Sequence, residues 1–469
     1  MRTLHHAFRL LVLMLFLACT PEKKADYKAE LWLTTTDKRA LPEQTSVDIS
    51  RDSAVDIVIT VDPAKTYQTM DGFGYTLTGG SALHIHNMSA TARRNLLREL
   101  FGTGKDGIGV SYLRVSIGAS DLDERLWSYN DTAEGETDEE LKNFSMAYDT
   151  LHLIPVLKEI LEISPEIKIM GSPWSPPKWM KDNKDTRGGS LLPEYYDSYA
   201  RYFVKYVEGM RDYGIRIDAV TVQNEPLHPG NNPSLLMLPE QQGEFIKDHL
   251  GPVFEGAGID TKIIIYDHNA DRPDYPISIL DDPEAAKYID GSAFHLYGGE
   301  VGALSRVHEA HPDKNLYFTE QWVGAPGDFA KEMAWHTENL IIGATRNWCK
   351  TVLEWNLAAD ENQDPHTDRG GCDRCLGAVT ITGDQVTREP AYYIIAQASR
   401  FVPPGSVRID SDIQGAIANV AFKTPEGKYV CILQNTGTEE QKVAVKLEHR
   451  AVPVKLGAGN IGTLVISVP

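Results

Sequence analysis

Short apolar runs alternate with longer amphipathic segments through the middle of the chain. Apolar runs of a few residues between turn residues are typical of buried strands, and the longer segments show helical spacing. Segment 195–213 places aromatic residues at i, i+3, i+4 and i+7, and Ser89 is a suitable N-cap for a helix over 90–101. Eight runs are predicted to be strands: 68–75, 112–116, 167–172, 219–223, 262–266, 292–295, 315–319 and 352–357.

This pattern predicts an α/β fold in which strand–helix units close into a (β/α)8 barrel, since eight parallel strands close such a barrel. Both ends of the chain instead alternate apolar and polar residues one by one, as in segments 53–62 and 441–449. Such alternation is typical of half-buried strands. We therefore predict a β-sandwich built from both chain ends, residues 29–66 with 402–469, fused to a catalytic barrel at 67–401.

The first residues have the organisation of an export signal. Two arginines precede an apolar run at 10–18, which is too short to span a bilayer. The run ends in Phe-Leu-Ala-Cys, which resembles a bacterial lipobox with Phe16 in place of the usual leucine. We expect residues 1–19 to be a lipoprotein signal ending at Cys19, and 20–28 to be a tether. The protein would then be exported and anchored to the cell envelope, at the periplasm or cell surface, only through lipidated Cys19. Ordinary signal cleavage is the alternative.

Composition and charge narrow the possible partners. The chain has 46 basic and 66 acidic residues, a net charge of −20, and its basic residues form no run. Binding to nucleic acid depends on lysine and arginine neutralising phosphates, so we do not expect a nucleic-acid partner. The hydrophobic fraction of 42% and the charged fraction of 24% are ordinary for a globular protein with a large core.

Two motifs could bind a metal, and neither is a strong signal. Cys372 and Cys375 form a single C-x-x-C in a loop rich in glycine and aspartate, without a second pair or histidine partners. In an exported chain a local disulfide is favoured over zinc. His84 and His86 form an H-x-H that lies well past the first predicted strand. No H-E-x-x-H, P-loop or G-x-S-x-G motif occurs. We therefore predict neither metal nor cofactor.

Polar and aromatic residues recur where the predicted strands end. In a (β/α)8 barrel the loops after the strands build the active site. Glu225 follows the fourth predicted strand and Glu320 the seventh, so both would face one pocket. Two carboxylates across a pocket suit retaining glycoside hydrolysis, because one protonates the leaving oxygen while the other attacks the anomeric carbon. The other residues at or after strand ends are Arg114, Asp121, Trp174, Asn224, His295, Tyr297, Trp355 and Asn356.

Each of these residues alone has an ordinary structural explanation. A glutamate at a strand end is usually solvated or salt-bridged, an aromatic ring is often part of the core, and His295 could be a buried, hydrogen-bonded histidine. Independent surface residues would have no reason to gather at successive strand ends. Their combination therefore favours a site.

Several short motifs, taken in order, resemble glycoside hydrolase family 30. The most specific is Ser-Pro-Trp-Ser-Pro-Pro-Lys-Trp-Met at residues 172–180. The resemblance covers nearly all of residues 30–469, and the family includes glucosylceramidase and microbial β-1,6-glucanases. The other motifs are Asp-Gly-Phe-Gly at 71–74, Leu-Arg-Val-Ser at 113–116, Gln-Asn-Glu-Pro at 223–226, Phe-His-Leu-Tyr at 294–297 and Thr-Glu at 319–320.

The resemblance implies a (β/α)8 barrel with a fused β-sandwich and a retaining mechanism without metal or cofactor. It makes Glu225 the acid/base and Glu320 the nucleophile. It implies that Asn224 hydrogen-bonds the sugar 2-hydroxyl and that Arg114 supports the carboxylates from below. The residues implied to line the subsite of the non-reducing sugar are Asp121, Trp174, His295, Tyr297 and Trp355, with Trp322 as a further candidate.

The segment after the eighth predicted strand, 355–381, looks more like the β-1,6-glucanase branch of the family than the lipid-cleaving branch. We therefore expect an endo-acting enzyme that cleaves β-1,6-glucan by double displacement. A glucosylceramidase or β-glucosidase of the same family is the alternative, and a xylan-cleaving relative is less favoured. A hypothesis of another class, a non-catalytic glycan-binding lipoprotein, would be marked by loss of Glu225 or Glu320, and both are present.

Overall fold

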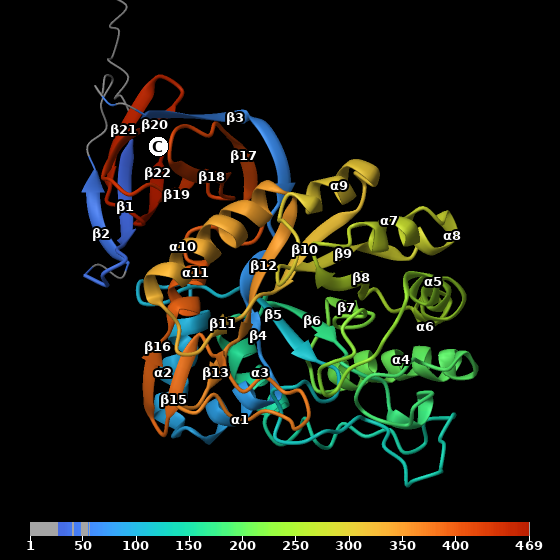
Figure 1. Ribbon diagram of the computed structural model, residues 1–469. Helices are drawn as coiled ribbons and strands as arrows, with labels where there is room; N and C mark the ends of the chain where they lie inside the picture. Colours follow the sequence, from blue (N-terminus) through green and yellow to red (C-terminus); the bar gives the residue numbers. More distant parts are fainter. Residues whose placement is uncertain (1–26, 40–41, 48–54, 56, 469) are drawn as a thin grey trace, which may run out of the picture.

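The computed structural model describes residues 27–39, 42–47, 55 and 57–468 (Figure 1). The predicted signal, including Cys19, lies outside the described residues, as does most of the predicted tether. Lys28, the last tether residue, begins strand β1 (Lys28–Thr34). Among the helices of the described part, none has the length and apolar character needed to cross a membrane.

Eight parallel strands form a closed barrel in the order β10-β12-β4-β5-β6-β7-β8-β9, which confirms the predicted fold class. The predicted segment 68–75 contains the end of another strand, β3, before the first barrel strand begins at Gly72. The barrel strands are β4 (Gly72–Thr76), β5 (Tyr112–Ser116), β6 (Lys168–Ser172), β7 (Ala219–Thr221), β8 (Lys262–Asn269), β9 (Ile289–His295), β10 (Asn315–Glu320) and β12 (Cys349–Asn356).

Helices cover the outside of the barrel between the strands (Figure 1). The Ser89 side chain accepts a hydrogen bond from the Ala92 N–H and caps α2 as predicted, and the aromatic face of α4 is buried. The helices are α1 (Gly79–Asn87), α2 (Ala90–Phe101), α3 (Leu153–Ile163), α4 (Tyr196–Asp212), α5 (Pro239–Glu244), α6 (Gly251–Ala257), α7 (Asp274–Leu280), α8 (Pro283–Ala286), α9 (Ala303–Ala310), α10 (Phe329–His336) and α11 (Pro390–Ser399).

An apolar layer fills the middle of the barrel. It takes one residue from each of seven barrel strands, and all of them are buried. Packed layers of this kind make a (β/α)8 barrel a solid core rather than a pore. The polar side chains that lie further along these strands therefore pack on top of this apolar layer. The layer consists of Tyr112, Met170, Ala219, Ile264, Ala293, Tyr317 and Leu353.

Both chain ends meet in one nine-stranded sheet, as the alternating patterns predicted. β1 pairs with β22, and β3 lies between β17 and β20. The two end strands, β2 and β21, contact each other, so the sheet folds over a core of its own. The remaining strands of this sheet are β2 (Glu43–Val47), β3 (Ile57–Thr69), β17 (Val407–Ser411), β18 (Ile417–Lys423), β19 (Tyr429–Asn435), β20 (Gln441–Leu447), β21 (Arg450–Leu456) and β22 (Ile461–Ser467).

Short strands arrange the loops that follow β10 and β12. β11 (Val323–Gly324) pairs with β14 (Cys375–Leu376), which brings the loop after the eighth barrel strand next to the exit of the seventh. A second small sheet is formed by β13 (Ala358–Ala359), β15 (Val379–Thr382) and β16 (Gln385–Arg388). The loops at this end of the barrel are therefore tied to one another.

Candidate active site

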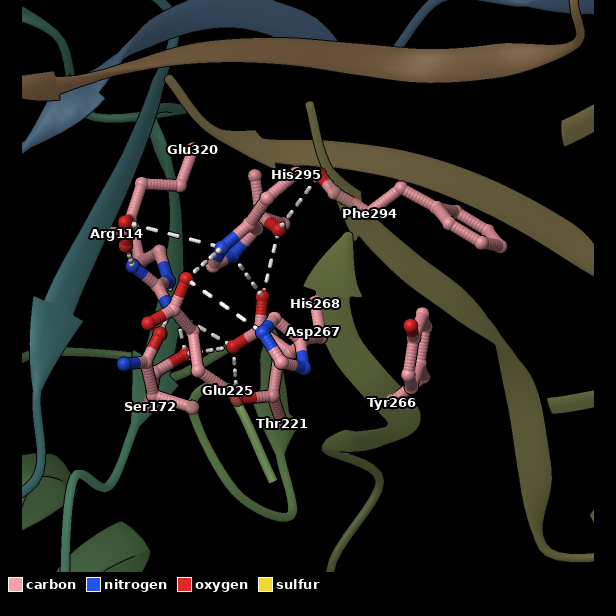
Figure 2. Close-up of polar contacts among 12 residues, drawn as sticks. Arg114, Ser172, Thr221, Glu225, Tyr266, Asp267, His268, Phe294, His295 and Glu320 are labelled. Atoms are coloured by element: carbon pink, nitrogen blue, oxygen red, sulfur yellow. Dashed lines mark hydrogen bonds and ion pairs between the residues drawn. The ribbon is translucent and has the colours of Figure 1, made fainter. Parts of the chain in front are cut away.

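Glu225 and Glu320 face each other at the carboxyl-terminal end of the barrel (Figure 2). Glu320 is the last residue of β10, and Glu225 lies in the loop after β7 with a φ of 45°, which is uncommon for a residue other than glycine. One oxygen of each carboxylate and a ring nitrogen of His295 all lie within 4.8 Å of one another. Retaining enzymes hold their carboxyl groups about 5–5.5 Å apart and inverting enzymes about 6.5–9.5 Å. The spacing fits a retaining pair.

Arg114 lies on β5 beneath the two carboxylates and is fully buried. Its Nη1 donates to Glu320 Oε2 at 2.6 Å, and its Nη2 donates to Asn224 Oδ1 and to Asp267 Oδ2, both at 2.7 Å. Its Nε donates to Ser172 Oγ at 3.0 Å. The planar guanidinium has its donors in a fixed fork, so these bonds hold Glu320 in one orientation. The resemblance to family 30 implied a supporting place beneath the carboxylates for Arg114, and these hydrogen bonds are compatible with that role.

Asp267 is the centre of the buried network, and the sequence did not predict it. Its Oδ1 accepts a hydrogen bond from Thr319 Oγ1 at 2.6 Å and also lies 3.1 Å from His295 Nε2. Its Oδ2 accepts a hydrogen bond from Thr221 Oγ1 at 2.8 Å. Burial alone would raise the pKa of Asp267, but Arg114 and His295 outweigh burial and hold this pKa far below its ordinary value. Asp267 is therefore a permanent anion beneath the site.

His295 ends β9 and lies between three carboxylates. Its Nδ1 is 3.2 Å from Glu225 Oε1 and 3.8 Å from Glu320 Oε1, and its Nε2 faces Asp267. Burial lowers the pKa of His295, but the charge of Glu320 and the hydrogen bonds to Asp267 and Glu225 raise it to about 9. The ring is therefore an imidazolium at neutral pH, and both of its N–H groups donate to carboxylates.

The two glutamates titrate as a pair, and their pKa values move in opposite directions: that of Glu320 is raised and that of Glu225 is lowered. Burial raises the pKa of Glu320 against the lowering effects of His295 and Arg114. Burial also acts on Glu225, but the hydrogen bond and charge of His295 outweigh it and lower the pKa of Glu225. In the free protein, the proton nearest to Glu225 therefore belongs to the His295 ring, at the 3.2 Å contact.

A cavity of about 330 Å³ opens above the two glutamates. Trp174 and Trp355 stack in its wall with ring centroids 5.3 Å apart. The Tyr297 hydroxyl donates to Glu320 Oε1 at 3.0 Å, while the residue as a whole is 40% exposed. Flat aromatic faces beside acids suit a sugar, which has apolar faces and a hydroxyl rim. The cavity is lined by Asp121, Trp174, Glu225, His228, Asn231, His268, Asn269, Tyr297, Glu320, Trp322, Trp355, Cys372 and Cys375.

Asp121 provides an acceptor in the wall of this cavity. Burial and the charges of Glu320 and Glu225 raise the pKa of its carboxyl to about 8, although the backbone N–H of Cys372 lowers it. Its Oδ1 is buried and has no hydrogen-bond partner among the described residues. Buried polar atoms are rarely left without a partner, so a ligand hydroxyl would complete this group.

The residues predicted from the sequence occupy two levels of the site. Those that line the cavity are Asp121, Trp174, Glu225, Tyr297, Glu320, Trp322 and Trp355. Arg114, Asn224 and His295 lie just below, in the network that orients the glutamates. The Asn224 side-chain oxygen is bound by Arg114, which fixes the orientation of its amide.

Sequence reasoning missed a group of polar residues around Glu225. Asn231 Nδ2 donates to Glu225 Oε2 at 3.3 Å, and His268 Nε2 lies 3.9 Å from Glu225 Oε1. Burial lowers the pKa of His268 to about 4, so its ring is neutral. Asp267, His268 and Asn269 directly follow an apolar run, and this was the signal that could have revealed them. The predicted strand ended at residue 266, but β8 continues through all three.

Three of the four residues of the two weak metal motifs have other partners in the structure. Cys372 and Cys375 are joined in a disulfide, so they offer no thiolates to zinc. His84 lies on α1 with its Nε2 2.8 Å from the Asp364 carbonyl oxygen. Among the described residues, the one cluster with three groups of the metal-ligating type is Glu225, His295 and Glu320, and each of the three already has hydrogen-bond partners within the site.

Comparison with known proteins identifies the family. Residues 70–402 match the glycosyl hydrolase family 30 TIM-barrel domain, and residues 405–464 match its beta sandwich domain. The endo-1,6-beta-D-glucanase of Aspergillus fumigatus is 32% identical over 418 residues, which cover 83% of each chain. The lysosomal acid glucosylceramidase of Mus musculus is 31% identical over 418 residues, covering 83% of this chain and 79% of the relative. The solved structure of the endo-beta1,6-glucanase BT3312 is 36% identical with a TM-score of 0.87, covering 93% of this chain and 99% of that one. This chain therefore belongs to glycoside hydrolase family 30 and is a retaining glycoside hydrolase.

Proposed function

We propose that the protein is an endo-acting β-1,6-glucanase with Glu225 as the acid/base and Glu320 as the nucleophile. The observation that carries this proposal is the pair of buried carboxylates with oxygens within 4.8 Å, at the floor of a cavity with aromatic walls. The linkage is supported by the names of two similar proteins, the A. fumigatus enzyme and BT3312, which are both endo-1,6-glucanases.

Glu320 is held ready for attack on the anomeric carbon. Arg114 binds its Oε2 at 2.6 Å, which leaves Oε1, with the longer hydrogen bond from Tyr297, as the attacking oxygen. Attack forms a bond from Oε1 to the anomeric carbon and breaks the bond to the leaving oxygen. The product of this step is a covalent glycosyl-enzyme.

Glu225 must carry a proton when the leaving oxygen departs, and His295 can supply it. Moving the proton across the 3.2 Å contact from His295 Nδ1 to Glu225 Oε1 gives a neutral imidazole and a carboxylic acid, with no change in the net charge of the site. Glu225 then gives this proton to the leaving oxygen. As a carboxylate it next takes a proton from water, which attacks the anomeric carbon and releases Glu320.

The remaining residues of the site would hold the non-reducing sugar. The unpartnered Asp121 oxygen would accept a sugar hydroxyl hydrogen bond, and the stacked Trp174 and Trp355 would form the apolar part of the wall beside the sugar. The Asn224 oxygen is bound by Arg114, so its NH₂ group is the end that would donate to the 2-hydroxyl. Trp322 and Tyr297, which also line the cavity, would contact the same sugar.

A glucosylceramidase or β-glucosidase activity is the second candidate, because the mouse relative is a glucosylceramidase at 31% identity. Both candidates take a non-reducing glucose over Glu320 and differ in the leaving group.

We also propose that the chain is exported and lipidated at Cys19, on the strength of the lipobox-like Phe-Leu-Ala-Cys. A non-catalytic glycan-binding role has no support from a site that keeps both carboxylates.

Product analysis separates these candidates. A soluble form that lacks residues 1–19 and so cannot be lipidated, residues 20–469, is incubated separately with linear β-1,6-glucan, β-1,3-glucan, xylan and glucosylceramide. Short β-1,6-linked oligosaccharides that appear early are the expected result. Glucose as the sole product, or release of ceramide with the glucan intact, would contradict the proposed specificity and leave the two-glutamate mechanism standing.

Two substitutions test the roles of the glutamates. Glu320→Gln should lower kcat by at least about 10³-fold, while Glu284→Gln, at an exposed glutamate on α8, should have no effect. Glu225→Gln should lower turnover of glucan by about 10²–10⁴-fold and that of an aryl glucoside with a good leaving group far less, because only the poor leaving group needs protonation. Equal losses on both substrates would argue against Glu225 as the acid.

A further inference from the structure

The Cys372–Cys375 disulfide forms part of the wall of the sugar cavity. Both cysteines line the cavity that contains the two glutamates. Cys375 belongs to one buried apolar cluster with Leu122, Trp174 and Trp355, and Cys372 packs against this cluster. The disulfide therefore packs against the tryptophan pair within the cavity wall.

One side of the disulfide loop is attached to the loop that carries Asp121. The Thr367 N–H donates to the Asp121 carbonyl oxygen at 2.9 Å, and the Thr367 hydroxyl donates to the Asn232 carbonyl oxygen. Further along, Cys372 and Asp121 line the same cavity, and the backbone N–H of Cys372 lowers the pKa of the Asp121 carboxyl group. The position of Cys372 therefore affects the one acidic side chain in the wall whose oxygen lacks a partner among the described residues.

The other side of the loop is attached to the exit of β10. Cys375 pairs with Gly324 in the small sheet of β11 and β14. The Ala325 N–H donates to the Arg374 carbonyl oxygen at 2.7 Å, and Arg374 Nη2 donates to the Ala325 carbonyl oxygen at 2.6 Å. β11 begins three residues after Glu320. This attachment fixes Cys375 to the strand that carries Glu320.

Cys372 lies between these attachments in an irregular stretch. Arg369 is held by an ion pair to Asp185 at 2.9 Å, and Arg374 is held by its hydrogen bond to Ala325. Asp373 and Arg374 are exposed, and Cys372 itself is half-buried. The bond to Cys375 is the covalent link that holds Cys372 against the cavity.

We propose that the Cys372–Cys375 disulfide is a positioning element of the sugar subsite, which holds the Cys372 backbone on Asp121 and supports the Trp174–Trp355 pair, so that the sugar binds tightly only in the oxidised enzyme. The proposal rests on the proposed function in one respect, the placement of the non-reducing sugar between Asp121 and the tryptophans. It does not depend on the β-1,6 linkage.

The other cysteines allow a clean experiment. Cys349 and Cys431 are buried free thiols, and burial raises the pKa of Cys349 well above its ordinary value and that of Cys431 to about 12. The thiolate is the reactive form of cysteine, so these thiols stay inert. Dithiothreitol therefore acts at one place in residues 20–469: the Cys372–Cys375 bond breaks, two thiols form, and the reagent is oxidised to its cyclic disulfide.

The test compares oxidised and reduced enzyme on an aryl β-glucoside and on β-1,6-glucan. Reduction should raise KM for both about tenfold and change kcat by less than about threefold, because the subsite loosens while the glutamates keep their network. Reoxidation should restore KM. The double variant Cys372→Ser/Cys375→Ser should have the raised KM and no response to dithiothreitol, and Cys431→Ala should respond like wild type.

Three outcomes decide the matter. An unchanged KM in enzyme whose Cys372 and Cys375 both titrate as free thiols would overturn the proposal. A fall in kcat together with a lower melting temperature and unchanged KM would also overturn it, because the disulfide would then stabilise the fold and not the subsite. If the aryl glucoside shows the redox-dependent KM while β-1,6-glucan stays intact in both forms, the proposed specificity fails and the positioning role stands. The comparison of oxidised and reduced wild-type protein distinguishes these three outcomes even if the double variant does not fold.

Discussion

Two buried histidines in this protein lie between carboxylates, one in the active site and one outside it. His295 is held by Glu225 and Asp267 at the end of β9. His336 ends α10, with its Nδ1 2.7 Å from Glu354 Oε1 and its Nε2 3.3 Å from Glu332 Oε2. Burial alone would lower the pKa of each ring, but the acidic neighbours raise both to about 9.

The surroundings of the two histidines differ. Glu225 opens onto the sugar cavity, and Arg114 and Asn231 provide further donors to the carboxylates around His295. The His336 pair joins α10 to β12, outside the cavity of the glutamates, and Glu354 Oε2 is buried without a hydrogen-bond partner among the described residues. A perturbed pKa therefore marks a buried ion pair, and only convergence of several groups on a cavity marks a reacting site.

The largest expected effect separates the two histidines by turnover. His295→Gln should lower kcat/KM on β-1,6-glucan by about 10²–10³-fold, because Glu225 loses the neighbour that shares its proton. His336→Gln should leave kcat/KM within about threefold of wild type, since His336 touches neither glutamate of the site. Steady-state kinetics at neutral pH checks both variants. Comparable losses in both variants would remove the distinction drawn between the two ion pairs.

The pH dependence of stability tests what the two rings share. The pKa of each rises from 6.5 in the unfolded chain to about 9 in the fold, so the native state binds more protons between these values. The free energy of unfolding is then greatest below about pH 6.5 and falls as pH rises through about 9. At about 1.4 kcal/mol per pKa unit, each ring contributes roughly 3 kcal/mol.

Urea unfolding at about pH 6 and about pH 9.5 measures this fall. His336→Gln should make this fall smaller by roughly 3 kcal/mol, because the other groups whose pKa changes on folding, including His295 and Asp121, still titrate in that variant. A variant that keeps the full fall would show that the His336 ring does not change its protonation state on folding.

The local pattern of the sequence was sufficient to locate the barrel strands, but it could not predict how the strands of the nine-stranded sheet pair with one another. Apolar runs between turn residues located all eight barrel strands, because burial on both faces makes such strands apolar throughout. The alternating segments at the chain ends predicted half-buried strands. That β3 lies between β17 and β20 depends on contacts across more than 300 residues, which no local pattern contains.

In the site, the strand-end rule found residues that directly follow apolar runs, such as Glu320 and His295. It missed Asp267 and His268, because β8 continues through polar residues and apolar periodicity ends a strand at the first of them. Charged strand residues are tolerated here because Arg114 pairs with Asp267 at 2.7 Å. That pairing joins residues far apart in sequence and becomes visible only in the folded barrel.

The smallest expected effect concerns an ion pair that is neither enclosed nor part of the site. At the opposite end of the barrel, Lys168 Nζ lies 2.7 Å from Asp71 Oδ1, and Lys350 Nζ lies 3.5 Å from Asp71 Oδ2. The Lys168 side chain is 34% exposed, so water screens the pair, and such pairs contribute at most about 1 kcal/mol.

Lys168→Met should therefore lower the free energy of unfolding by less than about 1 kcal/mol, since Lys350 still faces the Asp71 carboxylate, and should leave kcat/KM unchanged. Breaking an enclosed ion pair costs about 3–5 kcal/mol, and Arg114→Met, which strips the buried Asp267 and Glu320 of their cation, provides that reference. Urea unfolding of both variants gives the comparison. A loss above about 3 kcal/mol in Lys168→Met would mean that the ion pair at this end stabilises the fold as strongly as the buried pairs beneath the glutamates. Burial of the ion pairs would then no longer distinguish the end of the barrel that carries the site from the opposite end.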